Sequence, residues 1–274
     1  MKNSPESVLH REKWHDQLVE VIEKDDRRSL YFASFLLQSS MSLCSPQQLV
    51  LSYTRYMLLG LPAMPEPRHI LIIGIGAGSL VRFCHHHFPD CRIDAVDCSA
   101  PVIDLARGYF QLPENRQVGI YCREGQAFLS EVSDSRRYDL ILVDAYDHKG
   151  MSETIYTAPF FKLCATVLKE DGILSCNLWS SEPGRLQRIR DALRTFFQGH
   201  LYVPVPERGN VVILASPHPI PWQKFNRNNE EWLFWEQRFD LDFRAMLSTA
   251  RRHNQTLLQR LAAHFRAMYS GGIN

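Results

Sequence analysis

The chain has 274 residues, of which 45% are hydrophobic and 22% charged, so it can form a sizeable core without disulfides or structural metals. Its 31 Lys and Arg residues nearly balance its 30 Asp and Glu residues, which gives a formal net charge of +1. This balance argues against a protein whose main task is to coat nucleic acid or an anionic membrane. We therefore expect neither of these partners.

The N-terminal part has the pattern of a small β element followed by a helix. Two short apolar segments within residues 18–37 flank a polar run, which predicts a β-hairpin. A helix is expected over residues 45–61, with Ser45 as its cap and Pro46 at its first position. We assign residues 1–66 to this N-terminal element.

From residue 67 onward, short apolar strands alternate with helical segments. The predicted strands are residues 69–73, 92–96, 118–122, 138–143, 173–178, 201–205 and 210–215. Because several strands are apolar on both faces, the pattern predicts an α/β fold with a mainly parallel, Rossmann-like sheet of seven strands. We assign residues 67–217 to this nucleotide-binding catalytic domain.

The C-terminal part, residues 218–274, is predicted to be a helical extension. It begins with a proline-rich linker, and residues 229–268 have an amphipathic helical pattern. We expect these helices to pack on the main domain or on a second subunit, so the sequence leaves a homodimer open.

A glycine-rich turn follows the first strand of the sheet. Gly74, Gly76 and Gly78 permit a tight turn and a close approach of the backbone to a ligand. The helix that follows offers free N–H groups at its start. A dinucleotide site has a further glycine where Ser79 stands, whereas the spacing here is usual for S-adenosylmethionine sites. The turn therefore predicts a site for an adenosyl-sulfonium nucleotide.

Acidic residues follow the next two strands. Asp97 ends the second strand, where a carboxylate can accept hydrogen bonds from both ribose hydroxyls. Glu124, followed by Gly125, comes after the third strand and can accept a hydrogen bond from an adenine amino group. Because ligands of such sheets bind at the carboxyl ends of the strands, we expect both carboxylates to share one site with the glycine turn.

Two further carboxylates, Asp144 and Asp147, follow the fourth strand at the same edge. This pairing suits chemistry on an amine. Asp147 would hold an ammonium group, and Asp144 would accept a proton as the nitrogen becomes a nucleophile.

Other polar clusters predict no ligand site. The run His85–His87 ends a helix away from the expected ligand edge, so we expect it to be solvated and not to bind metal. Arg185, Arg188, Arg190 and Arg194 lie along one predicted helix, where we expect a solvated face.

The cysteine pattern and the N-terminal residues indicate in which cellular compartment the protein is expected. There are seven scattered cysteines with no C-x-x-C motif, which predicts neither disulfides nor zinc. Residues 1–16 are polar and charged, unlike a signal peptide. The sequence thus favours a cytoplasmic protein without a metal.

Residues 30–216 resemble the spermidine synthase (polyamine aminopropyltransferase) family. The matching segments are Leu37-Gln38-Ser39, Tyr53-Thr54, residues 73–79, Asp97, Glu124-Gly125, Asp144-Ala145-Tyr146-Asp147, and residues 152–161 and 168–174. The resemblance implies an S-adenosylmethionine methyltransferase-like fold and decarboxylated S-adenosylmethionine as the donor. It also implies that Gln38 lies on the nucleotide side and that Tyr53, Tyr146 and Asp147 face a small amine substrate.

Three positions depart from the family's pattern. The aspartate of the family's glycine loop is Ala77 here, the glutamine beside Tyr53 is Thr54, and the amine-clamping tyrosine is Val205. We therefore expect altered amine and aminopropyl subsites, with weak or absent activity toward putrescine.

Three functions stay open at this point. The leading one is aminopropyl transfer from decarboxylated S-adenosylmethionine to an amine. The second is an S-adenosylmethionine-dependent methyltransferase, because Ala77 lacks the negative charge that would oppose the methionine carboxylate. The third is a non-catalytic nucleotide-binding homologue.

Overall fold

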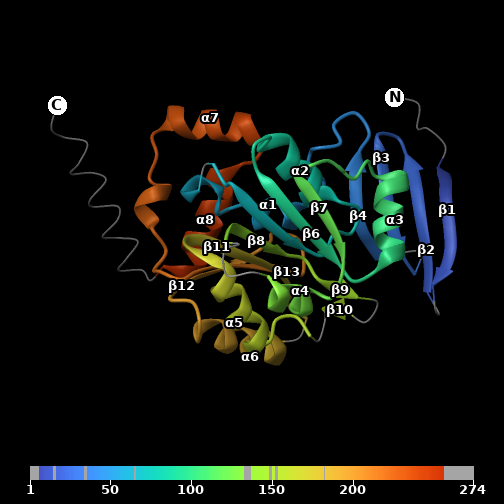
Figure 1. Ribbon diagram of the computed structural model, residues 1–274. Coiled ribbons are helices and arrows are strands. Elements are labelled where there is room, and N and C mark those ends of the chain that lie inside the picture. The colour runs from blue at the N-terminus through green and yellow to red at the C-terminus, as the bar shows by residue number, and fades with distance from the viewer. Residues whose placement is uncertain are drawn as a thin grey trace.

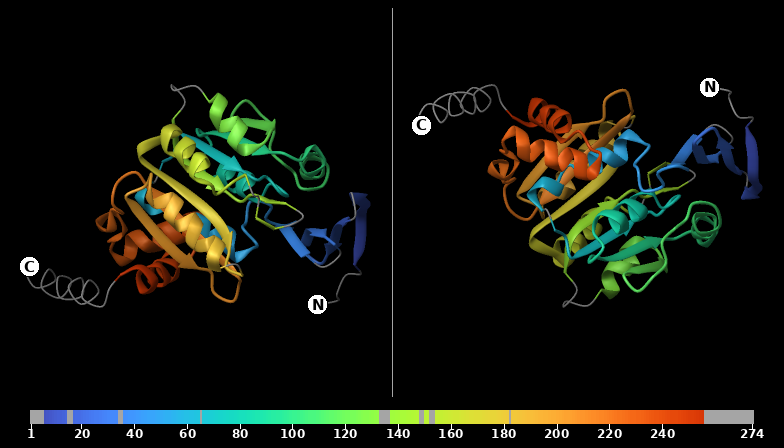
Figure 2. Two further views of the ribbon diagram at one scale, coloured as in Figure 1. Left: turned by 90° about the horizontal axis from the view of Figure 1, so that it is seen from below. Right: turned by 90° about the horizontal axis from the view of Figure 1, so that it is seen from above.

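The computed structural model of the chain describes residues 6–14, 17–33, 36–64, 66–132, 137–147, 150–151, 154–181 and 183–255. A small antiparallel sheet lies beside a larger, mostly parallel sheet, and helices cover both faces of the larger one (Figure 1). The small sheet projects to one side of the larger sheet (Figure 2).

The N-terminal sheet has four antiparallel strands in the order β1-β2-β3-β4. They are β1 (Ser7–Trp14), β2 (Gln17–Lys24), β3 (Arg27–Phe32) and β4 (Leu36–Ser42). The predicted hairpin is confirmed as β2 and β3, and the structure adds β1 and β4 on either side. The apolar pattern missed β1 because this strand is largely exposed; its Arg11 pairs with Glu20 of β2 at 2.7 Å.

The larger sheet contains all seven predicted strands. They are β5 (His69–Ile73), β6 (Arg92–Asp97), β7 (Val118–Cys122), β8 (Tyr138–Val143), β11 (Leu168–Trp179), β12 (Gly199–Pro204) and β13 (Asn210–Ser216). Their spatial order is β12-β13-β11-β8-β5-β6-β7. All pairings are parallel except those of β13, which is antiparallel to both neighbours. The predicted α/β fold with a mainly parallel sheet is thus confirmed.

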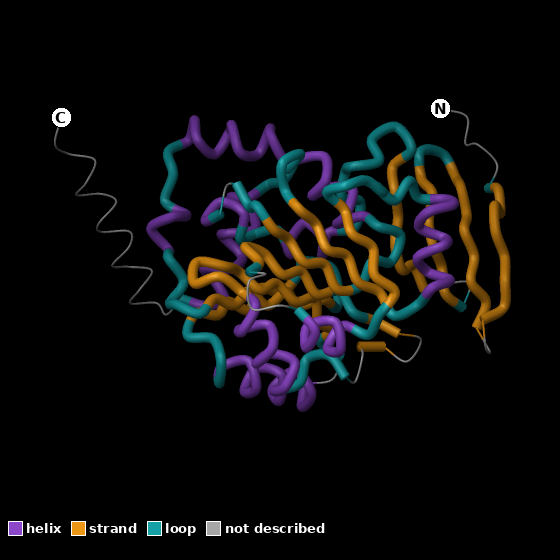
Figure 3. The backbone as a smooth tube through the Cα atoms, viewed as in Figure 1, coloured by secondary structure: helices purple, strands orange, loops and turns teal. Residues whose placement is uncertain are grey.

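Helices form a layer on each face of this sheet (Figure 3). One layer holds α1 (Ser52–Met57), α2 (Ser79–His87), α3 (Ala100–Tyr109), α7 (Asn229–Phe239) and α8 (Phe243–Asn254). The other holds α4 (Gly125–Glu131), α5 (Ala158–Val167) and α6 (Pro183–Arg194). Ile70 and Ile72 of β5 face the first layer, and Leu71 and Ile73 face the second. Each central strand must therefore be apolar on both faces.

The helix expected over residues 45–61 is shorter than predicted. It begins only at Ser52, so the prediction that Ser45 caps it is wrong. Asp26 organises the chain before it, because its carboxylate accepts hydrogen bonds from Ser42 Oγ at 2.6 Å and from the Cys44 N–H at 2.8 Å. These hydrogen bonds, that of Ser42 first, lower the pKa of Asp26 to about 2.

The C-terminal helices pack on the first layer as expected. Trp232, Trp235 and Phe239 of α7 are buried, and the Phe239 ring lies 6.1 Å from that of Phe83 on α2. Residues 256–274 lie outside the described part of the chain. The division into domains at residues 66/67 and 217/218 stays a prediction. None of the helices in the described ranges is both long and apolar enough to cross a membrane.

A buried carboxyl group joins four strands of the larger sheet. Asp94 of β6 has no exposed surface and accepts a hydrogen bond from the Tyr138 hydroxyl of β8 at 2.9 Å. The His69 Nε2 atom of β5 lies 3.0 Å from the same carboxylate oxygen, and Tyr121 of β7 donates to the other at 3.2 Å. This cluster satisfies a polar group that would otherwise be costly to bury.

The substitution Tyr138→Phe removes one hydrogen bond from this cluster. We expect the free energy of unfolding to fall by about 1–3 kcal/mol, the scale of a buried polar group that loses a partner. Urea denaturation measures the change. Tyr56→Phe is the control, because the Tyr56 hydroxyl makes no hydrogen bond to a described residue. Equal stability of both variants would contradict the role assigned to the cluster.

Candidate functional site

The glycine turn brings β5 against the end of β8. Gly74, Gly76 and Gly78 have φ angles of 93°, 52° and 76°, a region that strongly favours glycine. A Cβ atom on Gly74 would overlap the carbonyl oxygen of Asp144. The chain can therefore place these two strand ends together only with glycine at position 74.

A buried arginine holds the turn in place. Arg82 of α2 is 4% exposed, and its guanidinium donates to the carbonyl oxygens of Ala77, of Phe110 at 2.6 Å and of Pro46 at 2.8 Å. Burial lowers the pKa of Arg82 to about 10, so the group stays charged at neutral pH. The sequence analysis missed this residue, although a lone arginine among apolar residues of a helix is a usable signal.

Asp97 lies at the end of β6 and ties it to the turn. One carboxylate oxygen accepts from the Ile75 N–H at 2.9 Å, and the other accepts from the Ser99 N–H at 2.9 Å. Burial raises the pKa of Asp97, and the backbone hydrogen bonds oppose that rise. Two carboxylate oxygens can accept about four hydrogen bonds in all, so the predicted contact with ribose hydroxyls is compatible with this geometry.

Glu124 lies beside Asp97, because the Arg123 N–H donates to the Asp97 carbonyl oxygen at 2.9 Å. Its side chain caps α4 by accepting from the Ala127 N–H at 2.8 Å, and it accepts from Thr154 Oγ1 at 2.9 Å. Its contact with adenine stays a prediction. Gly125 is needed for packing, since a Cβ there would lie 2.7 Å from Ile73 of β5.

Asp144 is the centre of a polar network at the end of β8. Tyr53 of α1 donates its hydroxyl to one carboxylate oxygen at 3.1 Å, and the Asn177 amide of β11 donates to the other at 2.8 Å. Asn210 of β13 donates in turn to the Asn177 side-chain oxygen at 2.9 Å. The network thus fixes the carboxylate from three different elements.

The electrostatic surroundings favour a basic carboxylate. Burial raises the pKa of Asp144, the hydrogen bonds from Asn177 and Tyr53 oppose the rise, and the nearby charge of Asp97 adds to it. Burial and the Asp144 charge raise the pKa of Tyr53 well above its usual value, so Tyr53 is a neutral hydroxyl. Sequence reasoning did not predict that Asn177 and Asn210 support Asp144.

The residues after Asp144 stay close to it. The Tyr146 hydroxyl donates to the Asn177 carbonyl oxygen at 3.4 Å, and the Tyr156 hydroxyl donates to the same oxygen at 2.9 Å. The backbone of Asp147 lies in the short strand β9 (Tyr146–Asp147), which pairs with β10 (Gly150–Met151). The Asp147 side chain lies outside what the structure describes, and its role stays a prediction.

The N-terminal sheet reaches the site through β4. Consecutive residues Leu30 and Tyr31 of β3 pair with Ser39 and Leu37, so Gln38 is the extra residue of a β-bulge. The Ser39 hydroxyl lies 3.3 Å from that of Ser79 at the start of α2. Gln38 is thus next to the glycine turn, while its contact with a nucleotide stays a prediction.

The three departures from the family's pattern are all buried. Ala77, Thr54 and Val205 have exposed fractions of 0%, 3% and 2%. The Thr54 hydroxyl donates to the Leu51 carbonyl oxygen of its own helix at 2.6 Å. None of the three side chains presents a polar group to the site.

In the run His85–His87, His86 is exposed as expected, whereas His87 is not simply solvated. His87 packs against Phe83 and Phe239, and burial lowers its pKa to about 4. Within the described ranges, no three His, Cys, Asp or Glu side chains are placed to hold a metal ion.

Comparisons with known proteins agree with this arrangement. A model of the spermine/spermidine synthase domain matches residues 51–214. The polyamine aminopropyltransferase of Chromobacterium violaceum is 35% identical over 249 residues, which cover 86% of this chain and 90% of that protein. The corresponding protein of Neisseria meningitidis serogroup A is 34% identical over 241 residues, with the same coverage.

Solved structures share the fold at low sequence identity. A probable spermidine synthase from Corynebacterium glutamicum has a TM-score of 0.67 at 19% identity, over 84% of this chain and 86% of that one. Spermidine synthase from Thermotoga maritima has a TM-score of 0.62 at 18% identity, over 85% and 87%. Human Methyltransferase-like protein 13 in complex with SAH has a TM-score of 0.61 at 21% identity, over 71% and 93%.

The sequence matches extend over the strands, the glycine turn and the network around Asp144. The structural matches extend over the same sheet. The chain belongs to the spermine/spermidine synthase family.

Proposed function

We propose that the protein is a transferase that moves the aminopropyl group of decarboxylated S-adenosylmethionine to a small amine. The observation that carries this proposal is the partly buried Asp144 carboxylate, which lies against Gly74 between the Tyr53 hydroxyl and the Asn177 amide. The curated relatives, which are named polyamine aminopropyltransferases, support the same reaction.

Asp144 would act as the general base. An ammonium group has no free electron pair, so it must lose a proton before its nitrogen can attack. The nitrogen then forms a bond to the aminopropyl carbon next to the sulfonium, the carbon–sulfur bond breaks, and methylthioadenosine leaves with the electron pair. The proton moves to Asp144, whose pKa is raised by burial and which is therefore a stronger base than an exposed aspartate.

The nucleoside part of the donor would lie along the carboxyl ends of β5, β6 and β7. Gly74, Gly76 and Gly78 would allow the close approach of the backbone, and Asp97 would accept from the ribose hydroxyls. Glu124, Gly125 and Gln38 would complete the nucleotide side.

Tyr53, Tyr146 and Asp147 would face the amine. Both tyrosines are uncharged because burial raises their pKa.

The other candidate functions have less support. The likeness to the human methyltransferase-like protein shows a common fold and not a common donor, since the two chains are 21% identical. The intact network around Asp144 argues against a protein that has lost the chemistry. We therefore place ordinary S-adenosylmethionine second to the decarboxylated donor. A reducing, cytoplasmic location is supported by the seven cysteines, which are all free.

The substitution Asp144→Asn keeps the shape of the side chain and removes its basicity. Turnover should fall by ~10²–10⁴-fold, the usual span for loss of a general base, while the affinity for methylthioadenosine changes little. Methylthioadenosine release is measured with decarboxylated S-adenosylmethionine and a panel of amines that includes putrescine. Asp104→Asn, on the exposed face of α3, is the control. Full turnover of Asp144→Asn on the accepted amine would place the base elsewhere.

The substitution Asn177→Asp tests whether Asn177 positions and tunes Asp144. It replaces a donor by a second carboxyl group, which should raise the pKa of Asp144 further. Activity requires the deprotonated base, so the acid limb of the kcat profile should move to higher pH by about one unit or more. Asn226→Asp, an exposed asparagine, is the control and should leave the profile in place. A lower kcat without a shift of the acid limb would mean that Asn177 has only a structural role.

The substitution Asp97→Ala tests the nucleoside side. The affinity for methylthioadenosine should weaken by about 1.5–3 kcal/mol, the scale of charge-assisted hydrogen bonds. Calorimetry measures the affinity, and a thermal melt checks that the variant is folded, because Asp97 also bonds to the turn. Asp90→Ala is the exposed control. Unchanged affinity in a folded Asp97→Ala variant would show that the ribose assignment is wrong.

A further inference from the structure

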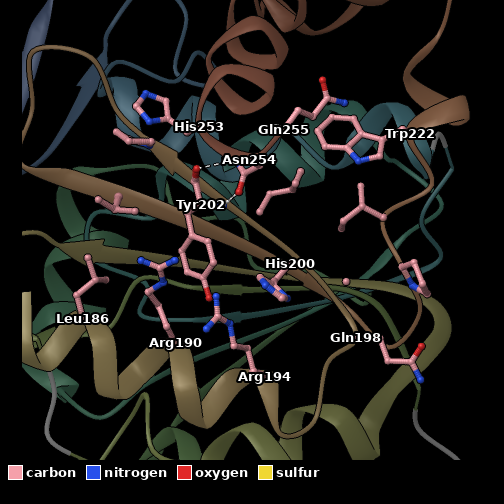
Figure 4. Close-up of a pocket in the computed structure, with 16 residues that line it drawn as sticks. Leu186, Arg190, Arg194, Gln198, His200, Tyr202, Trp222, His253, Asn254 and Gln255 are labelled. Atoms are coloured by element: carbon pink, nitrogen blue, oxygen red, sulfur yellow. Dashed lines mark hydrogen bonds between the residues drawn. The ribbon is translucent and has the colours of Figure 1, made fainter. Parts of the chain in front are cut away.

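A second cavity lies on the opposite flank of the larger sheet, between α6, β12 and the end of α8 (Figure 4). Its volume is about 860 Å³. None of the residues assigned to the candidate site lines it. The volume is within the range of small-molecule pockets, which is roughly 300–1,000 Å³. The cavity is therefore large enough for a small ligand of its own.

The cavity has a strongly basic lining. Arg190 and Arg194 lie one turn apart on α6, and His200 and His253 line the cavity from β12 and α8. No Asp or Glu is among its described lining residues, and the sequence of residues 256–274 contains none either. The described residues offer Arg190 no ion pair. The expected solvated arginine face is thus wrong for Arg190, which is only partly exposed.

Arg194 has one carboxylate nearby, which does little to offset its charge. Asp191 lies 3.7 Å from its guanidinium and is largely exposed on the same helix. Exposed pairs at this spacing are weak, so the positive charge of the cavity is not cancelled.

Three buried polar atoms around this cavity have no hydrogen-bond partner among the described residues. They are Arg190 Nε, His200 Nδ1 and the Tyr202 hydroxyl oxygen. Buried polar groups are normally paired, so an unpaired donor such as Arg190 Nε favours a bound acceptor. The other two atoms have neighbours close by, because Arg190 and Arg194 lie near the Tyr202 hydroxyl and the Gln198 backbone lies near His200. The guanidinium of Arg190 lies over the Tyr202 ring at 4.0 Å, and Arg194 points toward the hydroxyl end of the same ring (Figure 4).

The charges of Arg190 and Arg194 make the surroundings of His200 and Tyr202 positive, as expected of a site that binds an anion. Burial lowers the pKa of His200, and the charges of Arg194 and Arg190 lower it further. Burial raises the pKa of Tyr202, and the same two arginines oppose that rise. Both shifts have the sign that the positive charges of Arg190 and Arg194 produce.

The edge of the sheet beside this cavity is closed to a further strand. β12 is an edge strand, and an exposed edge can pair with another chain. Asn254 of α8 occupies the outward groups of Tyr202, because it accepts from the Tyr202 N–H at 2.8 Å and donates to its carbonyl oxygen at 2.9 Å. This contact favours a small ligand over a β-strand partner.

We propose that this cavity, defined by Arg190, Arg194, His200 and Tyr202, binds a small organic phosphate. Two guanidinium groups one helical turn apart can bind phosphate oxygens by paired N–H donors. An anionic oxygen between them would also supply the partner that Arg190 Nε lacks. Trp222 and Ile220 form an apolar wall for the remainder of the ligand.

Calorimetric titration of the full chain with phenyl phosphate tests this proposal, with phenol as the uncharged match. Methylthioadenosine is present at saturation, so the candidate site is occupied. Phenyl phosphate should bind and phenol should not. The double variant Arg190→Gln/Arg194→Gln keeps most of the side-chain length and should bind phenyl phosphate at least about tenfold more weakly.

Arg188→Gln is the matched control, since Arg188 is an exposed arginine of the same helix and does not line the cavity. It should leave the affinity unchanged. Absence of phenyl phosphate binding by the wild-type chain would overturn the proposal. So would equal affinity of the wild type and a folded double variant, or an equal loss in Arg188→Gln, which would indicate only a diffuse effect of charge. Asp144→Asn should bind phenyl phosphate normally, so this result is independent of the aminopropyl reaction.

Discussion

The contact between Gly74 and the backbone of Asp144 is the constraint on which the rest of the site depends. The end of β5 meets the end of β8 there, and the Asp144 N–H donates to the Ile73 carbonyl oxygen at 2.8 Å. Any side chain at position 74 would force these strands apart. The same backbone turn begins α2, so one tight junction sets both the glycine turn and the position of the carboxylate.

The network around Asp144 illustrates how neighbouring groups hold a partly buried carboxylate. A carboxylate in a low-dielectric environment is costly unless it accepts good hydrogen bonds. Tyr53 and Asn177 supply them, but they do not fully offset the effect of burial on its pKa. The balance leaves a carboxylate that is fixed in orientation and still able to take a proton.

The contacts of the N-terminal sheet give it a part in the site. Arg82 bonds to the segment that follows this sheet and to the glycine turn, and Ser39 of β4 lies against Ser79. A charged group buried in this way needs several partners, which explains why three carbonyl oxygens surround Arg82. The small sheet and the segment after it thus contact the glycine turn and the helix that follows it.

The sequence by itself determined the elements whose signals are local. Apolar strands, glycines that need positive φ, and the acidic residues Asp97, Glu124 and Asp144 can be identified without knowledge of distant contacts. Because the carboxyl ends of parallel strands meet at one edge, their placement together also followed. The exposed strand β1 and the late start of α1 did not follow, since the first depends on pairing with β2 and the second on the turn around Asp26.

Only the tertiary structure decided which side chains support that edge. Asn177 and Asn210 act through partners far away in the chain, so no local pattern marks them. For Arg82 the sequence shows only a lone arginine in an apolar helix, and only the fold shows that Pro46 and Phe110 accept its hydrogen bonds. The arginine face of α6 shows the same limit: helical spacing groups the side chains, but only the packing of β12 against α6 brings Tyr202 under Arg190. Spacing along a chain fixes which residues share a face, and the burial and charge of that face depend on the elements that pack against it.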